Sequence, residues 1–377
     1  MRFFPFGLAV LIALSGCGEA VEATSDGTGG TGDAGGAGGG SGGVGGSGGS
    51  GGAAPFVADL SHTFSPVFVD SGREIFGVCQ SWTLNNEEPL YVQGVRQTNE
   101  GAWHHSVWTY ATEGVFDGPD GNWSCYQRGY NAQSAAEAGG IIFNQSTQAF
   151  TEIQAFAEGA VVVLPPRSRI IGNIHLLNVS ASPIDTTLTM ELDTIPAEEV
   201  TVRLRPISLR NTQIAAQPGF ESRFSVSCNL SDLFTSILQV GEMPSYNMYY
   251  VLGHYHGWGN YFSFNFVNPD ESERTIVEFS SQPGDVLGVK LDPPLGSQGA
   301  VGLRLTCGYN NTGDKVLTWG IGDLEMCAAY AYIDADLAFE AFPSGDDALV
   351  PLGEDEENRL LYDMSGCSGF VASPFTD

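Results

Sequence analysis

Short runs of apolar and β-branched residues, separated by turn-forming clusters, dominate the chain from residue 55 onward. The runs are rich in Val, Ile, Thr, Phe and Tyr, and Gly, Pro, Asn and Asp cluster between them; they read LYVQGV, AVVVLP, TVRLRPI, MYYVLG, YFSFNFV, TIVEFSS, VGLRLTC and AYAYID. Helical periodicity is scarce. Runs of this length and spacing predict antiparallel β-sandwiches, so the expected fold class is all-β.

The part of the chain with this pattern is too long for one typical domain. Residues 55–377 suit two domains, and no fixed-period repeat divides them otherwise. A join is expected near DTIPAEEVTV, where a strand ends and an acidic, Pro-containing turn follows. The sequence therefore predicts two tandem β-sandwiches, 55–195 and 196–377.

The N-terminus has the features of an export signal. Arg2 supplies a positive charge, and residues 3–14 form an apolar segment too short to span a bilayer. The following LSGC resembles a bacterial lipobox, which implies a signal peptide over 1–16 and a lipid on Cys17. The alternative is an ordinary signal peptide with a chance cysteine. Residues 17–54 are Gly-rich and are expected to form a flexible tether.

This reading makes the protein an exported bacterial lipoprotein, facing the periplasm or the cell surface. No later segment is long and apolar enough for a membrane helix, so the lipid at Cys17 is its only expected membrane contact. The net charge of −29 repels nucleic acid and anionic lipid surfaces. Nucleic acid is therefore not an expected partner.

Cysteine usage agrees with export. Seven cysteines minus Cys17 leave six, an even number that predicts three disulfides in an oxidising compartment. Fifteen pairings are open at this point. None of the six has CxxC spacing, which disfavours a zinc knuckle or a thioredoxin-type site.

Four of the six histidines occur in two pairs. In GHYHGWG, His254 and His256 are two positions apart, so on a strand both side chains point to one face and Tyr255 points to the other. Such a pair can clamp a metal ion. The alternative is two imidazoles that meet by chance.

The other pair lies in AWHHSVW. His104 and His105 are adjacent, so both can reach one ion only where the strand bends or ends. His175, in RIIGNIHLLNVS, is a solitary ring in an apolar strand and is a core residue unless a third ligand is needed. His62 has no partner in sequence and is expected to be structural or on the surface.

A further candidate ligand is Met326 in GDLEMCAAYAY. A thioether is a soft ligand that favours Cu(I), although methionine more often fills a core. Two imidazoles and a thioether with open positions would suit copper that must bind dioxygen.

Taken in order over roughly residues 70–370, these motifs resemble the copper type II, ascorbate-dependent monooxygenases. That family includes peptidylglycine α-hydroxylating monooxygenase and dopamine β-monooxygenase. The resemblance rests on FGVCQSW, the HH pair, GNWSCYQRG, GNIHLLN, SVSCNL, LGHYHGWG, LRLTCGY and LEMCAAY.

The resemblance implies two copper ions per chain, one in each of two jelly-roll-like sandwiches, with a wet cleft between them. The electron-transfer copper would be held by His104, His105 and His175, and the dioxygen-binding copper by His254, His256 and Met326. It also implies the disulfides Cys79–Cys125, Cys307–Cys327 and Cys228–Cys367.

The implied activity is hydroxylation of an aliphatic C–H bond of a small-molecule substrate, with O2 and a reductant such as ascorbate. Leu252 and Ala328 stand where peptide-amidating members carry arginine and asparagine, so a substrate less charged than a peptide carboxylate is expected. Tyr330 matches a substrate-pocket tyrosine of the family, or else packs in the core. Two other functions stay open: a non-catalytic copper-sequestering lipoprotein, and a β-sandwich binding module with incidental histidines.

Overall fold

The computed structural model describes residues 56–131, 134–135, 139–238, 244–320, 324–344 and 349–372. The chain divides into two compact units after Ala53, and all of the described residues belong to the second. The expected signal peptide 1–16, the tether 17–54 and the proposed lipid site Cys17 lie outside them.

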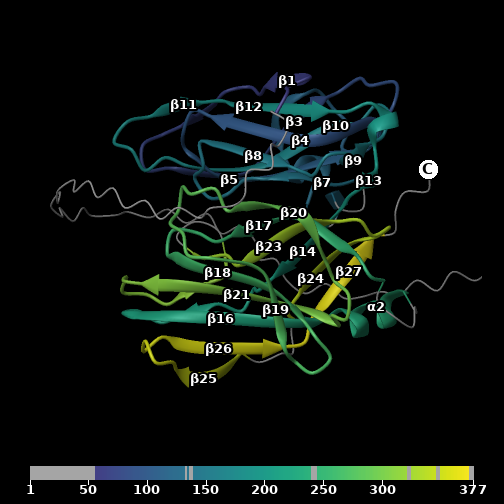
Figure 1. Cartoon of the computed structure of the whole chain (residues 1–377). Coiled ribbons are helices and arrows are strands. Elements are labelled where there is room, and N and C mark those ends of the chain that lie inside the picture. The colour runs from purple at the N-terminus through teal and green to yellow at the C-terminus, as the bar shows by residue number, and fades with distance from the viewer. Residues whose placement is uncertain are drawn as a thin grey trace, which may run out of the picture. The chain divides into compact units, whose positions relative to one another are not determined.

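The described part of the chain is an all-β sandwich fold, as predicted (Figure 1). All eight apolar runs lie in strands or immediately beside them. Helical structure among these residues includes two short 3-10 turns, Tyr126–Arg128 and Ala197–Glu199, and helix α2 (Leu230–Leu238). No helix in the described ranges is long and apolar enough to cross a membrane.

The N-terminal half, here residues 56–203, contains two main sheets. One has the order β1-β12-β4-β9-β13 with β8 paired to β4, and the other has the order β6-β3-β10-β5-β7. Their bounds are β1 (Leu60–Thr63), β3 (Glu74–Thr83), β4 (Leu90–Asn99), β5 (Trp103–Ala111), β6 (Gly121–Ser124), β7 (Gly139–Asn144), β8 (Thr151–Ala155), β9 (Ala160–Leu164), β10 (Arg169–Leu177), β12 (Leu188–Thr194) and β13 (Val202–Arg203), with β2 (Val67–Val69) and β11 (Ile184–Thr186) forming a small separate pair.

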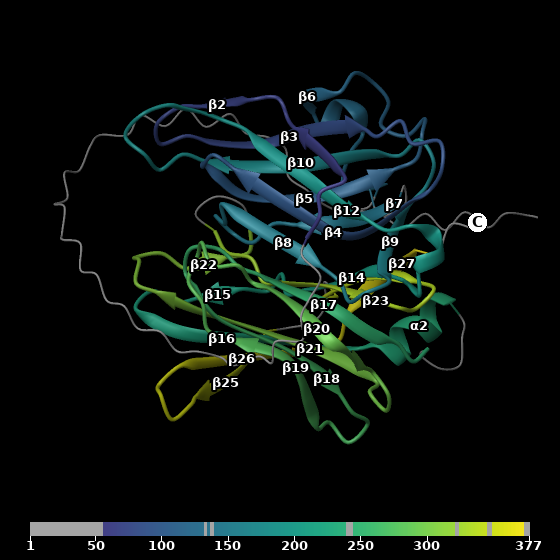
Figure 2. The ribbon, with the colours of Figure 1, turned by 45° about the horizontal axis from the view of Figure 1, so that its top comes forward.

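The C-terminal half, here residues 205–372, repeats this arrangement with sheets β20-β17-β23-β14-β24-β27 and β19-β18-β21-β16-β26-β25. Figure 2 shows the two sheets of each half stacked on one another. The bounds are β14 (Arg205–Arg210), β16 (Phe220–Asn229), β17 (Asn247–His254), β18 (Gly259–Val267), β19 (Glu273–Phe279), β20 (Gly288–Gly296), β21 (Gly302–Asn311), β23 (Ala328–Ile333), β24 (Ala338–Phe342), β25 (Val350–Glu354), β26 (Leu360–Ser365) and β27 (Ser368–Ala372), with β15 (Ala215–Ala216) and β22 (Leu317–Thr318) as a short pair.

The chain passes from one half to the other inside the run TVRLRPI. Val202 and Arg203 pair with β9, whereas Arg205 begins β14 and pairs with β23. The change of sheet therefore lies at Leu204, a few residues after the predicted join at 195/196. The predicted division into two domains remains an interpretation, because one buried cluster runs through both halves.

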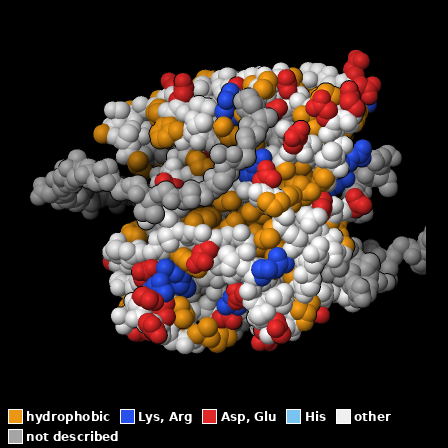
Figure 3. Space-filling view, in the orientation of Figure 1, with side chains coloured by type: hydrophobic (Ala, Val, Ile, Leu, Met, Phe, Trp, Pro, Cys, Tyr) orange, Lys and Arg blue, Asp and Glu red, His pale blue; other side chains and the backbone are white. Residues whose placement is uncertain are grey.

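Aromatic side chains connect the two halves. Phe156 lies 4.9 Å from Tyr332 and 6.2 Å from Tyr250, measured between ring centroids. The Tyr332 hydroxyl also donates to the carbonyl of Ile141 at 3.4 Å. Apolar side chains gather across the middle of the face shown in Figure 3, with charged ones scattered around them. Burial of an aromatic side chain such as Phe156 between the halves contributes roughly 1.5–3 kcal/mol to stability.

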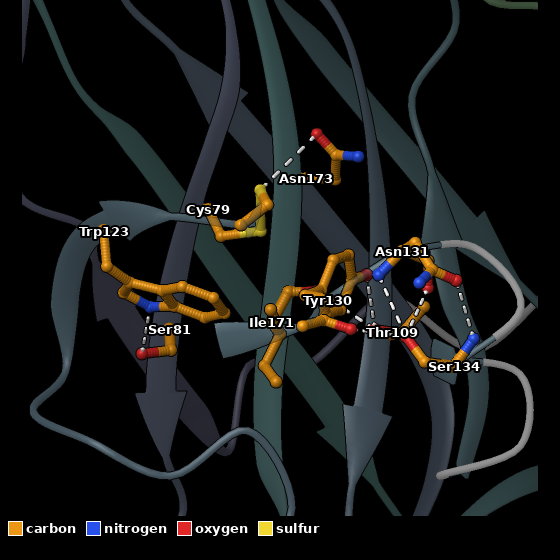
Figure 4. The surroundings of a disulfide bond; sticks show 11 residues. Cys79, Ser81, Thr109, Trp123, Tyr130, Asn131, Ser134, Ile171 and Asn173 are labelled. Atoms are coloured by element: carbon orange, nitrogen blue, oxygen red, sulfur yellow. Dashed lines mark hydrogen bonds between the residues drawn. A yellow bond between two sulfur atoms is a disulfide. The ribbon is translucent and has the colours of Figure 1, made fainter. Parts of the chain in front are cut away.

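Three disulfides join cysteines in the described part of the chain, and their pairing is the one implied by the resemblance: Cys79–Cys125, Cys228–Cys367 and Cys307–Cys327. Figure 4 shows the first of them beside Asn173 of β10, and near it the Trp123 indole donating to Ser81 at 3.0 Å. This bridge ties β3 to the segment after β6, next to the strand that carries His175.

Candidate metal centre

Five of the six histidines converge on one place. His104, His105, His175, His254 and His256 form a continuous cluster in which neighbouring ring centroids lie 4.7–5.3 Å apart. The sixth, His62, is elsewhere and stacks on Trp82 at 5.0 Å. Three separate segments of the chain therefore supply one imidazole cluster, and His62, expected to be structural or on the surface, lies apart from it.

A β-bulge explains how the adjacent pair His104 and His105 reaches the same place. His175 of β10 is paired with His105, and the next pair is Leu176 with Trp103. His104 is thus an extra residue in β5, and such a residue changes the direction of the side chains around it. This is the strand bend that two neighbouring ligands require.

The second pair is placed differently from the prediction. His254 is the last residue of β17, and His256 lies in the loop that follows rather than on the strand. Tyr255 between them is fully buried, and its hydroxyl donates to the Ser281 carbonyl at 3.0 Å. The two imidazoles still face the same cluster, with centroids 5.3 Å apart.

Glu325 stabilises the backbone where the chain leaves the sheet. Its buried carboxylate accepts the backbone N–H groups of His256 at 2.8 Å and of Trp258 at 2.7 Å. These two donors would otherwise be available to a neighbouring strand. Sequence reasoning missed Glu325, because an acidic residue beside Met326 looked like ordinary surface.

Two overlapping triads in the cluster have metal-binding geometry. One is His104, His105 and His175, and the other is His105, His254 and His256. In each triad the ligand nitrogens lie within 4.8 Å of one another. The first triad is the set that the sequence predicted, whereas the second contains His105 in addition to the predicted pair.

Several ring nitrogens in the cluster are buried without a hydrogen-bond partner. These are the Nε2 atoms of His104, His254 and His256. The Nδ1 of His256 donates to the Leu324 carbonyl at 2.8 Å, so its Nε2 is the ring nitrogen that carries the free lone pair. Buried polar atoms are normally satisfied, so these three nitrogens fit a metal ion as the missing partner.

Burial keeps these rings neutral. It lowers the pKa of His104 to about 3 and that of His256 to about 4, and it lowers the pKa values of His105 and His254 well below 6.5. The neighbouring imidazoles act in the same direction, because a second positive charge in the cluster would be repelled. Neutral imidazole is the form that binds metals, so protons compete weakly here.

Glu74 orients the third histidine of the first triad. Its carboxylate is hydrogen-bonded to Nε2 of His175, and Nδ1 of that ring lies 3.0 Å from Nε2 of His105. A carboxylate on one ring nitrogen is a common way to fix the other toward a metal. Glu74 was not predicted, since it is 101 residues from His175 and carries no local motif.

Met326 lies directly after Glu325. Its carbonyl accepts the Tyr309 hydroxyl at 2.7 Å, and the Cys307–Cys327 bridge fixes the following residue. The backbone of Met326 is therefore held close to the loop that carries His256. Coordination by its half-buried thioether stays a prediction.

The expected substrate residues lie on the same strand pair as His254. Leu252 is paired with Tyr330, and His254 with Ala328, so by the two-residue period all four side chains leave the same face of the sheet. Leu252 and Ala328 are buried. On this face Tyr250 and Tyr332 meet Phe156, so a packed contact occupies part of the surface where a wet cleft was expected.

Comparisons with known proteins give no family for this chain. No family model and no curated protein matches it. Among solved structures it is similar to the PBSX exported protein XepA, at 7% identity over 74% of this chain and 89% of that one, with a TM-score of 0.20. A putative secreted protein from Parabacteroides distasonis matches at 7% identity, over 72% and 88% of the two chains, with a TM-score of 0.18. Scores this low support no functional conclusion.

Proposed function

We propose that this protein binds copper and uses it as a monooxygenase of the type II, ascorbate-dependent class. The observation that carries the proposal is the convergence of five imidazoles with three buried, unpartnered Nε2 atoms. A cluster of neutral histidines costs stability unless something binds their lone pairs. One metal ion would bind the free nitrogen of His104, and a second would bind those of His254 and His256.

His104, His105 and His175 would hold one copper, and His254 and His256, with Met326 as the expected soft ligand, would hold the other. Bound copper would supply one-electron transfer and dioxygen activation for attack on an aliphatic C–H bond. Glu74 would orient His175, and Glu325 would hold the backbone of His256 in place. Leu252, Ala328 and Tyr330 would give the neighbouring surface its apolar character, suited to an uncharged small molecule.

A second function, copper storage without turnover, is favoured by the burial of the centre. Of the cluster, His104, His175, His254 and His256 are each at most 5% exposed. A substrate would need an opening motion to reach them, whereas a sequestered ion would not.

Metal analysis of the purified chain, combined with oxygen uptake, tests both functions. Copper bound to the protein and ascorbate-driven oxygen uptake that leaves a hydroxylated product would support the monooxygenase. Copper without turnover would favour storage. A protein that binds no copper would overturn both and favour a binding module with incidental histidines. The Met326→Ile variant should lose oxygen chemistry and keep the ion bound by His104 and His175.

The three disulfides indicate that the protein matures in an oxidising compartment and is exported. We propose in addition that Cys17 carries a lipid. Cys17→Ala should then move the protein from the membrane fraction to the soluble fraction when it is expressed in a bacterium. An unchanged distribution would contradict lipid anchoring.

A further inference from the structure

We propose that His105, His254 and His256 form a metal site that joins the two halves of the fold, with His105 in the position that Met326 was expected to fill. His105 comes from β5 of the N-terminal half, while His254 and His256 come from the end of β17 and the loop after it. The site goes beyond the proposed function, because it replaces Met326 by His105 in the ligand set of the second metal ion, and that metal need not be copper.

Distances within this triad are short enough for one ion. The ring centroid of His105 lies 4.8 Å from that of His254 and 5.2 Å from that of His256, and the ligand nitrogens lie within 4.8 Å of one another. A tetrahedral ion with bonds of about 2.0 Å places its nitrogens roughly 3.3 Å apart. Small rotations of the side chains would close the triad around an ion.

Two nitrogens of the triad have no other partner. Nε2 of His254 and Nε2 of His256 are buried and accept no hydrogen bond from the described residues. Nδ1 of His256 is already committed to the Leu324 carbonyl, which fixes the ring with Nε2 free. In the other half of the fold, His256 contacts two histidine rings, with centroids 4.7 Å away for His104 and 5.2 Å away for His105.

The contact between the halves is built around these histidines. Thr147 donates its hydroxyl to the Tyr255 carbonyl at 2.5 Å and accepts the Gly284 N–H at its own carbonyl at 2.9 Å. The next residue, Gln148, donates its N–H to the His104 carbonyl at 2.7 Å. One short segment therefore holds the backbone beside the first histidine pair and the peptide between the second pair. These hydrogen bonds fix the distance between the two histidine pairs that an ion would connect.

The donor set indicates the class of metal. Three neutral imidazoles without a carboxylate suit borderline ions such as Zn(II) or Cu(II) and disfavour Mg(II) and Ca(II). An ion held in this way would stabilise the folded state by mass action, because the three ligands come together only when both halves are folded and docked.

Zinc binding in the full chain tests the proposal without any redox chemistry. The double variant His104→Ala/His175→Ala removes the first triad and should still bind one Zn(II), measured by competition with a chromophoric chelator. Adding His105→Ala to this background should weaken zinc binding at least about 100-fold, since loss of a direct ligand exceeds the 10- to 100-fold effects of outer contacts. Adding His254→Ala should do the same.

Met326→Ile in the same background is the discriminating variant, and it should leave zinc affinity unchanged. His62→Ala is the matched control, a histidine outside the cluster. Unfolding of each variant in EDTA, followed by circular dichroism, shows whether it is folded, and zinc should raise the melting temperature only where the triad is intact. Zinc binding that survives His105→Ala, or that is lost in Met326→Ile, overturns the site. The zinc measurements do not depend on oxygen chemistry. If the protein proved to have no monooxygenase activity, the zinc result would still decide whether this site exists.

Discussion

At the scale of single residues, two carboxylates determine how the histidines are presented. Glu74 accepts from a ring nitrogen of His175, and Glu325 accepts backbone N–H groups around His256. Neither belongs to a recognisable motif, and each reaches its partner across a long stretch of sequence. They could not be predicted, because their roles depend on which strands become neighbours.

Replacing Glu74 should weaken metal binding at the first triad. Glu74→Ala removes the group that orients His175, and we expect a 10- to 100-fold loss of copper affinity, as for other outer-sphere partners. Glu74→Gln keeps an acceptor oxygen and should recover part of the loss. Chelator competition measures the affinity, and the Cu(II) spectrum should shift in the Ala variant because the His175 ring is no longer held in one orientation.

The control for this change is Glu191→Gln, a carboxylate paired with Arg96 in the same half of the fold. Glu191→Gln should leave the copper affinity and the Cu(II) spectrum unchanged. If Glu74→Ala behaves like Glu191→Gln, the orienting role of Glu74 is wrong.

At the scale of elements, the sequence predicted the strands well and their irregularities poorly. The runs rich in Val, Ile, Tyr and Phe became strands because such side chains pack on a pleated, half-buried surface. The bulge at His104 could be expected only as a bend of unknown kind, since register depends on the partner strand β10. The sequence analysis placed His256 on the strand with His254, which is wrong. His256 lies in the following loop, where Glu325 binds its backbone N–H.

Strand β10 also shows how a small residue positions the site. Gly172 is paired with Trp108 of β5, and a Cβ atom at Gly172 would lie 2.4 Å from the Trp108 ring. Gly172→Ala should therefore force the buried indole or the strand to move and cost about 1–3 kcal/mol of stability. Urea unfolding measures this cost.

The matched substitution is Gly257→Ala, where an added Cβ meets nothing within 4 Å. It should change the free energy of unfolding by less than about 0.5 kcal/mol. Equal stability of the two variants would show that the Trp108 contact does not limit the size of the residue at 172.

At the scale of the whole molecule, both halves of the fold contribute histidines to the cluster. The sequence predicted the two histidine pairs and His175 as candidate ligands, but it assigned the two pairs to separate sites with a cleft between them. The distance between the halves depends on contacts such as Phe156 with Tyr332 and Thr147 with Tyr255, which no local pattern encodes. His105 consequently lies in both triads, although its sequence motif pairs it only with His104.

The metal-free protein should lose stability as the pH falls from about 6.5 to 4.5. In this range the unfolded chain protonates histidines whose folded pKa values are far lower, at about 3 for His104 and about 4 for His256, so protons favour unfolding. Burial raises the pKa values of Glu152 and Glu325 to about 7, and these two groups act in the opposite direction, because the folded state retains their protons.

The histidine effect should prevail, because His105 and His254 have strongly lowered pKa values as well. Each histidine contributes a slope of up to about 1.4 kcal/mol per pH unit. Urea unfolding in EDTA at several pH values measures the slope, which should become shallower in His104→Ala and steeper in Glu152→Gln. Stability that rises on acidification would contradict the assignment of neutral buried histidines.

The bridge between Cys228 and Cys367 joins residues 139 positions apart in the chain, and the shorter Cys307–Cys327 loop lies between them. A protease that cuts once between these two outer cysteines would leave both pieces covalently attached. The nicked protein would migrate as one band on a gel until a thiol reagent is added. His254, His256 and Met326 all lie inside this loop, so a protein exposed to extracellular proteases would retain these residues after its first cleavage there.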